Sequence, residues 1–291
     1  MAERSTPEMA SRRASERWRY APLDAGFAEQ VSCAVADIVA GFRGYRSWRY
    51  LAVESLKNQY RRTVLGPWWL TVQTALYIVG LALIFGQLLG AGLRSFVPYV
   101  ALGFVTFVLL QGLTVSASQV FVASPGRLKS IRQPMTSIVL HDAAVVFIQF
   151  GHNLVIFAVF FATGQMQAKP QALLALPVIA CIAINGVALG LWLGPLVARF
   201  RDVGPAVLSV LQVMIFFTPV FYKRSALHGA QANLVAWNPF TYLIDAFRLP
   251  LLGVRLHPGD FVGAGVVTVV NLALGLWVFS RYRSRVPYWV S

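Results

Sequence analysis

Six long apolar runs limit what this chain can fold into. Each holds about 20 residues with few charges, the length of an α-helix that crosses the hydrocarbon core of a bilayer. Backbone polar groups find no water in that core, so a spanning run of this length must be helical. The runs cover residues 68–89, 96–121, 138–163, 172–197, 206–222 and 261–280. The sequence therefore predicts an all-α membrane protein with six transmembrane helices.

The composition agrees with a membrane protein. Of the 291 residues, 57% are hydrophobic and 12% are charged, whereas soluble domains carry about 25% charged residues. Cys33 and Cys181 lie far apart, at no spacing suited to a disulfide framework, a metal site or redox chemistry. We expect both cysteines to be small packing residues.

The basic residues are distributed unevenly between the two sides of the predicted membrane. With the amino terminus in the cytoplasm, 19 Lys and Arg fall on the cytoplasmic side and 6 on the other. This asymmetry has the sign of the positive-inside rule. The first sixty residues are polar, without the apolar core of a signal peptide. We predict that both termini are cytoplasmic, and the net charge of +14 then requires no nucleic-acid partner.

An amphipathic helix is predicted just before the first span, over residues 45–60. Its apolar residues recur at steps of three and four, a pattern suited to a helix that lies flat in the membrane interface. A short soluble helix that packs on the membrane domain is the alternative. The apolar positions are Trp48, Leu51, Leu56 and Tyr60. Gly66 and Pro67 end the helix, and Trp68 with Trp69 follow at the depth of an aromatic membrane belt.

The loop between the second and third spans reads ASPGRLKSIRQPMTS, residues 123–137. Ser124 can cap a helix, Pro125 suits its first position, and Pro134 ends it. The loop is therefore predicted to form a short cationic helix on the cytoplasmic side. An ordinary connecting loop with positive-inside charges is the alternative.

The segment 223–259 is too long for a tight turn and too apolar for a solvated loop. A helix should begin at Pro239, and Asp245 and Arg248 are three residues apart, so they can pair on it. We predict a re-entrant helical hairpin that dips into the outer leaflet.

Motifs for catalysis are missing from the sequence. It contains no GxxxxGK[ST] phosphate loop and no Ser/His/Asp, metal or paired-carboxylate arrangement. We therefore expect no enzyme activity and no cofactor in this chain, with energy supplied by a partner or an ion gradient. A polar cluster in the third span could serve a proton relay, although hydrogen bonding between helices is the simpler explanation. The cluster consists of His141, Asp142, Gln149, His152 and Asn153.

Several motifs occur in an order that resembles one known family. They are NQYRRTVLGPWWLTVQ (58–73), RFRDV (199–203), FFTPVFY (216–222), WNPF (237–240), IDAFR (244–248) and RYRSRVPYWV (281–290). Together they resemble the membrane subunits of bacterial polysaccharide ABC exporters, the type-2 export permeases that move O-antigen, capsule or teichoic acid chains. The resemblance covers about residues 45–290. It implies an extension over residues 1–44, to which we assign no role beyond a cytoplasmic location, and a transporter transmembrane domain over 45–291.

The resemblance also implies partners, a location and roles for particular residues. The expected partners are a second copy of the chain, two copies of a cytoplasmic ABC ATPase that binds ATP and magnesium, membrane lipids and a lipid-linked polysaccharide. The expected location is the bacterial inner membrane. The short cytoplasmic helix becomes the coupling helix that docks on the ATPase, through Arg127, Leu128, Lys129, Ile131 and Arg132. The outer segment becomes a gate, with Tyr222, Asp245, Phe247 and Arg248 as its candidate residues.

A path for sugars needs aromatic faces on which pyranose rings can stack, together with hydroxyl and amide groups for hydrogen bonds. Spans one, two and five supply such groups, although lipid-facing or core packing is an alternative for each aromatic residue. The candidates are Tyr77, Phe104, Phe107, Gln111, Thr114, Ser118, Phe216, Phe217 and Phe221.

The sequence thus predicts the permease subunit of an ATP-driven exporter of lipid-linked polysaccharide. Export of a small lipid or drug by the same architecture is an alternative, and so is an ion-coupled flippase. A membrane scaffold without transport activity is an alternative from a different class.

Overall fold

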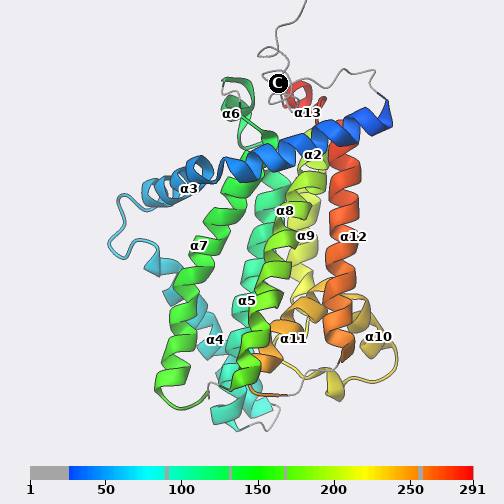
Figure 1. Cartoon of the computed structure of the whole chain (residues 1–291). Helices are drawn as coiled ribbons and strands as arrows, with labels where there is room; N and C mark the ends of the chain where they lie inside the picture. Colours follow the sequence, from blue (N-terminus) through cyan, green and yellow to red (C-terminus); the bar gives the residue numbers. More distant parts are fainter. Residues whose placement is uncertain (1–25, 89–91, 131–132, 167–168, 255–257, 291) are drawn as a thin grey trace, which may run out of the picture.

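The computed structural model describes residues 26–88, 92–130, 133–166, 169–254 and 258–290, and every regular element among them is helical. Five of the described helices are long and apolar enough to cross a membrane. They run side by side, as Figure 1 shows. These helices are α4 (Trp68–Leu88), α5 (Leu93–Gln119), α7 (Met135–Ala162), α8 (Ala175–Arg199) and α12 (Pro258–Tyr282). The prediction of an all-α membrane protein is confirmed.

The helix predicted over 206–222 differs from the expectation. It forms α9 (Val203–Met214), which has 12 residues and is therefore about 18 Å long, too short for the hydrocarbon core. From Ile215 to Tyr222 the chain continues in turns. Pro219 cannot donate a backbone hydrogen bond, and the Thr218 hydroxyl donates to the Met214 carbonyl at 2.7 Å. Five long helices and one short helix thus replace the six predicted spans.

Four helices lie at one end of the bundle, which we call the α2 end. They are α2 (Phe27–Arg43), α3 (Tyr45–Gln59), α6 (Pro125–Ser130) and α13 (Val286–Trp289). Figure 1 shows α2 and α3 lying across the long helices. The sequence analysis did not predict α2, although Phe27, Val31, Ile38 and Phe42 recur along it at helical spacing.

The predicted amphipathic helix is present as α3. Ala52 and Leu56 are buried, and α3 packs against α7. The Trp48 indole N–H donates to the Gly41 carbonyl of α2 at 3.2 Å, whereas Leu51 is exposed. One face of α3 therefore packs on the protein, and its contact with the membrane interface stays a prediction.

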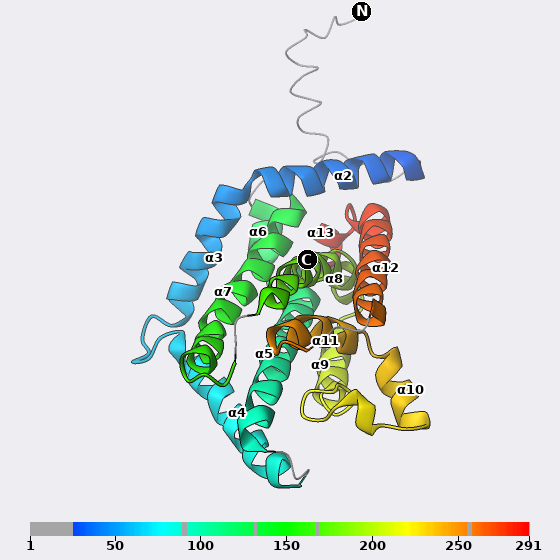
Figure 2. The same ribbon diagram turned by 60° about the horizontal axis from the view of Figure 1, so that its bottom comes forward.

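The opposite end, which we call the α11 end, carries the outer segment. It contains η1 (Pro170–Leu174), η2 (Arg224–Ala226), α10 (Ala230–Trp237) and α11 (Pro239–Leu251). Helix α11 begins at Pro239 as predicted, and the Asn238 side chain caps it by accepting from the Phe240 N–H at 2.9 Å. Helix α11 packs against α5, α8 and α12, so it is an integral part of the bundle (Figure 2).

Helix α5 forms the centre of the molecule and packs against α4, α7, α8, α9 and α11. Glycines on α8 allow very close helix packing. A Cβ atom at Gly186 would lie 2.8 Å from Leu113 of α5, one at Gly194 would lie 2.6 Å from Val120, and one at Gly190 would overlap Val139 of α7. Side chains of Leu113, Val120 and Val139 therefore pack directly on the backbone of α8, a close approach that small residues allow in membrane bundles.

Candidate functional site

The most polar part of the α11 end is built around Arg248. Its side chain is only 1% exposed, yet it has several partners. The guanidinium donates to the Asp245 carboxylate and to the carbonyls of Pro219 at 2.8 Å and Val220 at 3.3 Å. A buried cation is stable only when its charge and its N–H groups find such partners. The predicted pairing of Asp245 with Arg248 is confirmed.

The ring of Tyr99 forms the next layer of this site. The Arg248 guanidinium carbon lies 3.8 Å from the centre of the ring, a cation–π contact. The Tyr99 hydroxyl donates to the carbonyl of Tyr222 at 2.9 Å. Gly103 of α5 makes this approach possible, because a Cβ atom there would lie 2.8 Å from Arg248 and 3.0 Å from the Val220 carbonyl. The turns after α9 are therefore attached to both α5 and α11.

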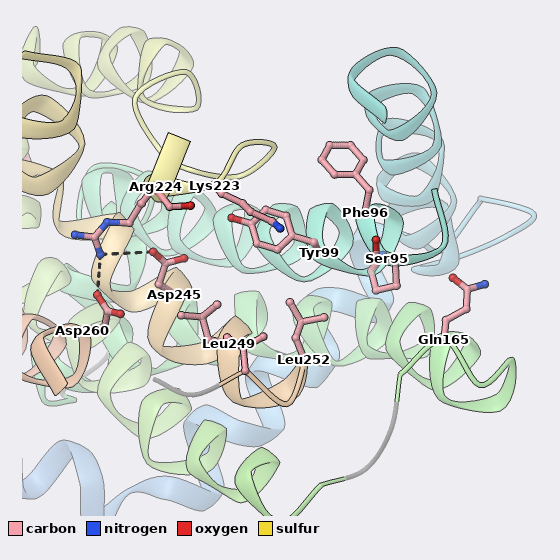
Figure 3. Close-up of a pocket in the computed structure, with 13 residues that line it drawn as sticks. Ser95, Phe96, Tyr99, Gln165, Lys223, Arg224, Asp245, Leu249, Leu252 and Asp260 are labelled. Atoms are coloured by element: carbon pink, nitrogen blue, oxygen red, sulfur yellow. Dashed lines mark hydrogen bonds and ion pairs between the residues drawn. The ribbon is translucent and has the colours of Figure 1, made fainter. Parts of the chain in front are cut away.

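Arg224 extends the charge network to α12. Its guanidinium lies 2.7 Å from Asp260 and 3.6 Å from Asp245, as Figure 3 shows. Burial raises the pKa of the Asp245 carboxyl, whereas the neighbouring Arg248 and Arg224 cations lower it. The network of Arg224, Asp245, Arg248 and Asp260, which we call the charge network, thus joins three helices, η2, α11 and α12.

A cavity of about 780 Å³ borders the charge network. Figure 3 shows Asp245 and Asp260 on one side of it and the aromatic residues Phe96 and Tyr99 on another. Ser95, Gln165 and Lys223 add polar groups, and Leu249 and Leu252 add apolar surface. Aromatic rings beside carboxylate and amide groups are suited to contact with a polar molecule that has apolar faces, such as a sugar.

The four predicted gate residues occupy different surroundings. Asp245 and Arg248 belong to the charge network, and Tyr222 lies beside it, partly buried. Phe247 is buried in the core, where its ring faces Phe150 and Phe157. Tyr99, Arg224 and Asp260 were not predicted, because nothing in the local sequence links them to α11.

The predicted conduit residues divide into three groups by exposure: exposed, partly buried and buried. Tyr77, Phe216 and Phe217 are exposed, and Tyr77 is 55% and Phe216 67% exposed. Gln111 and Thr114 are partly buried, and the Thr114 hydroxyl donates to the Leu110 carbonyl of its own helix. The remaining candidates are buried inside the protomer, so this conformation does not present them to a path. They are Phe104, Phe107, Ser118 and Phe221.

A groove of about 620 Å³ runs along the outer face of α4. Trp69, Leu76, Tyr77 and Ile84 line it, and all four are exposed. At the α11 end, Phe85 of α4 stacks on Phe221, with ring centres 4.7 Å apart. Tyr77 on α4 and Phe216 and Phe217 after α9 define what we call the aromatic face. These exposed rings belong to two segments that are joined by the Phe85–Phe221 contact.

The short helix predicted in the loop 123–137 forms as α6, which begins at Pro125. Arg127 donates to the Ser124 hydroxyl at 2.9 Å and lies 3.3 Å from Asp142 of α7. Leu128 packs against the apolar cluster at the α2 end. Ile131, Arg132 and the side chain of Lys129 lie outside the described residues. Arg127 and Leu128 therefore attach α6 to the bundle, and the role in docking stays a prediction.

Hydrogen bonds account for several members of the polar cluster on α7. His141 contacts Asp142 at 2.6 Å and the Ser55 hydroxyl of α3 at 3.0 Å. His152 contacts the Ile148 carbonyl at 2.8 Å. The contact between His141 and Ser55 joins α7 to α3, whereas the other two lie within α7. They fit the simpler of the two interpretations, hydrogen bonding.

Two tryptophans face outward at the start of α4, as a membrane belt requires. Trp68 and Trp69 are both exposed, and Trp68 packs edge-on against His152. Their depth in a bilayer stays a prediction.

The five long apolar helices, with α11 packed against three of them and four helices at the α2 end, define a multi-pass membrane protein. A model of the ABC-2 type transporter family matches residues 46–252. The chain belongs to this family, and the resemblance inferred from its motifs is confirmed. It is also similar to the O-antigen export system permease protein RfbA of Myxococcus xanthus, with 23% identity over 243 residues that cover 81% of this chain and 92% of the relative.

Proposed function

We propose that this chain is the membrane-spanning permease subunit of an ATP-driven exporter, which moves a lipid-linked polysaccharide of the O-antigen or capsule type out of the cytoplasm. The family supports the transporter class, and the printed name of the Myxococcus relative supports the substrate class. The observation that carries the proposal is the aromatic face, because exposed rings on α4 and in the turns after α9 suit the apolar faces of sugars.

The working unit is a homodimer. Helix α5 and its neighbours fill the interior of one protomer, so a polymer needs a path between copies. The groove on α4 and the aromatic face are open on the protomer surface, and a two-fold axis beside them would enclose one conduit with two equivalent walls. The short α9 completes a sixth crossing together with the turns that follow it.

Energy comes from two copies of a cytoplasmic ATPase bound at the α2 end. The chain has no phosphate-binding loop of its own. Most of the basic residues in the described part of the chain lie in the segments at this end, which therefore faces the cytoplasm of a bacterial inner membrane. Helix α6 takes up the motion of the ATPase. At the other end, α11 and the charge network close the mouth between turnovers.

The test is a deletion of this gene in its source bacterium, followed by complementation. Surface polysaccharide should disappear on deletion and return when the intact gene is supplied. It should not return in a strain whose partner ATPase lacks the lysine of its phosphate loop. Unchanged surface polysaccharide in the deletion strain would contradict the substrate. Loss of a small lipid from the outer leaflet, with normal polysaccharide, would favour the alternative exporter. Recovery of the protein without any ATPase would favour a scaffold.

A further inference from the structure

Asp37 of α2 joins three parts of the chain at the α2 end. Its side chain is 0% exposed. One carboxylate oxygen accepts from the Thr136 N–H at 2.9 Å and from the Thr136 hydroxyl at 2.6 Å. The other accepts from the Met135 N–H and from the Arg283 guanidinium, both at 3.2 Å. One buried carboxylate thus joins α2, to which it belongs, to the start of α7 and the residue after α12.

These contacts make Asp37 the cap of α7. The first N–H groups of a helix have no partner within the helix, and a negative charge beside them is favourable. The residue before α7 is Pro134, whose side chain makes no cap hydrogen bond. The cap is instead supplied by a helix almost 100 residues away in sequence. Gly41, one turn further along α2, allows the close approach, because a Cβ atom there would lie 2.8 Å from the Thr136 Cβ.

The position of this cap relative to α6 suggests its role. Helix α7 begins five residues after the end of α6, so along the chain Met135 and Thr136 are the first residues of α7 that a displacement of α6 reaches, in addition to the direct contacts of Arg127 and Leu128. Arg283 follows directly after α12, and the next helix, α13, contacts α6. Asp37 therefore contacts the start of α7, which follows α6 in the chain, and Arg283, which lies just before the helix that contacts α6.

We propose that Asp37 is a positioning residue for energy coupling: it holds the start of α7 and the end of α12 as one unit, so that movement of α6 is passed to both helices together. The inference rests on the proposed function, in which an ATPase moves α6. Asp37 and Arg283 both lie outside residues 46–252, the part that the family model matches. This chain therefore uses segments beyond that part to support its coupling helix.

The test compares export with ATP hydrolysis in the complete complex. Asp37→Asn keeps the size of the side chain but removes its charge. Per molecule of folded protein, surface polysaccharide should fall about fivefold or more, the lower range of coupling between linked sites, while ATP hydrolysis by the purified complex falls much less. Glu54→Gln is the matched control, because Glu54 forms an exposed ion pair with Lys57 on α3 at the same end. It should leave the ratio of export to hydrolysis unchanged.

A second variant separates coupling from folding. Asp37→Asn leaves Arg283 without this anion, so the protein could become less stable for that reason alone. The double variant Asp37→Asn, Arg283→Gln removes both charges and should recover the melting temperature. Its ratio of export to hydrolysis should stay low, because the carboxylate cap of α7 is still missing. A normal ratio in the double variant would overturn the inference. A wild-type complex that neither exports polysaccharide nor hydrolyses ATP would instead overturn the proposed function.

Discussion

Arg248 is the most deeply buried cation described in the structure, and it is held by partners from three segments. Asp245 balances its charge, and the Pro219 carbonyl after α9 accepts a hydrogen bond from its guanidinium. The ring of Tyr99 packs on the face of the guanidinium. Such a residue has a large effect when it is removed, because its partners then remain buried without it. The packing of the turns after α9 against α11 should therefore depend on the Arg248 side chain.

We predict that Arg248→Gln lowers the stability of the protein by about 3–5 kcal/mol, since it leaves the buried Asp245 without its nearest cation. The melting temperature of the detergent-extracted protein measures this effect. The double variant Asp245→Asn, Arg248→Gln should recover part of the loss, because no unpaired charge remains at that pair. Equal melting temperatures for the single and double variants would show that the ion pair does not stabilise this end.

The aromatic candidates make separate predictions because their exposure differs. Phe221 is 7% exposed and stacked on Phe85, so Phe221→Ala should cost about 3–5 kcal/mol of stability. Tyr77→Ala and Phe216→Ala should leave the melting temperature nearly unchanged. If these rings contact sugar, each change should still reduce export, because it removes a stacking contact worth about 1 kcal/mol. Surface polysaccharide per folded protein is the measurement, and normal export in both exposed variants would remove the aromatic face from the conduit.

At the scale of elements, sequence reasoning succeeded where a signal is local. Long apolar runs predicted the five long helices, and Pro239 predicted the start of α11, because hydrophobic length and a proline at the first helical position are local features. Helix α2 was not predicted although its apolar residues recur at helical spacing. The role of Asp37 on it has no local signal, because its partners Thr136 and Arg283 are 99 and 246 residues away. Only part of the charge network was predicted, because a pair within one helix has a local signal and contacts between segments have none. The Asp245–Arg248 pair lies on one helix, while Tyr99, Arg224 and Asp260 come from others.

Helix α6 provides a prediction about the ATPase. Reversing Lys129 and Arg132 to Glu should reduce the amount of ATPase that co-purifies, because both cations belong to the predicted docking loop. Arg127→Glu should in addition lower the melting temperature, since Arg127 pairs with Asp142 within the bundle. Arg61→Glu, an exposed position in the turn after α3, is the control. An unchanged yield of ATPase together with normal export would identify the loop as a plain connector.

For the molecule as a whole, orientation is the property on which the mechanism depends. All segments predicted to be cytoplasmic should be shielded from outside, and α10 should be accessible. After replacement of Cys33 and Cys181, a cysteine at Asn233 should react with an impermeant reagent in cells whose outer layers are opened. A cysteine at Ser130 should react only after the membrane is permeabilised. External labelling at Ser130 would reverse the topology and, with it, the assignment of the α2 end to the ATPase.

The glycines on α8 have a consequence for genetic studies of this protein. Gly186, Gly190 and Gly194 lie against side chains of α5 and α7 with no room for a methyl group. In a saturation mutagenesis experiment selected for growth, these positions should tolerate almost no substitution, although they touch only hydrocarbon inside one protomer. A map of the positions that tolerate no substitution would therefore highlight α8, although these glycines serve helix packing and not contact with the transported molecule. Exposed positions such as Tyr77 and Phe216, with a weaker signal, would be the better guide to the route of export.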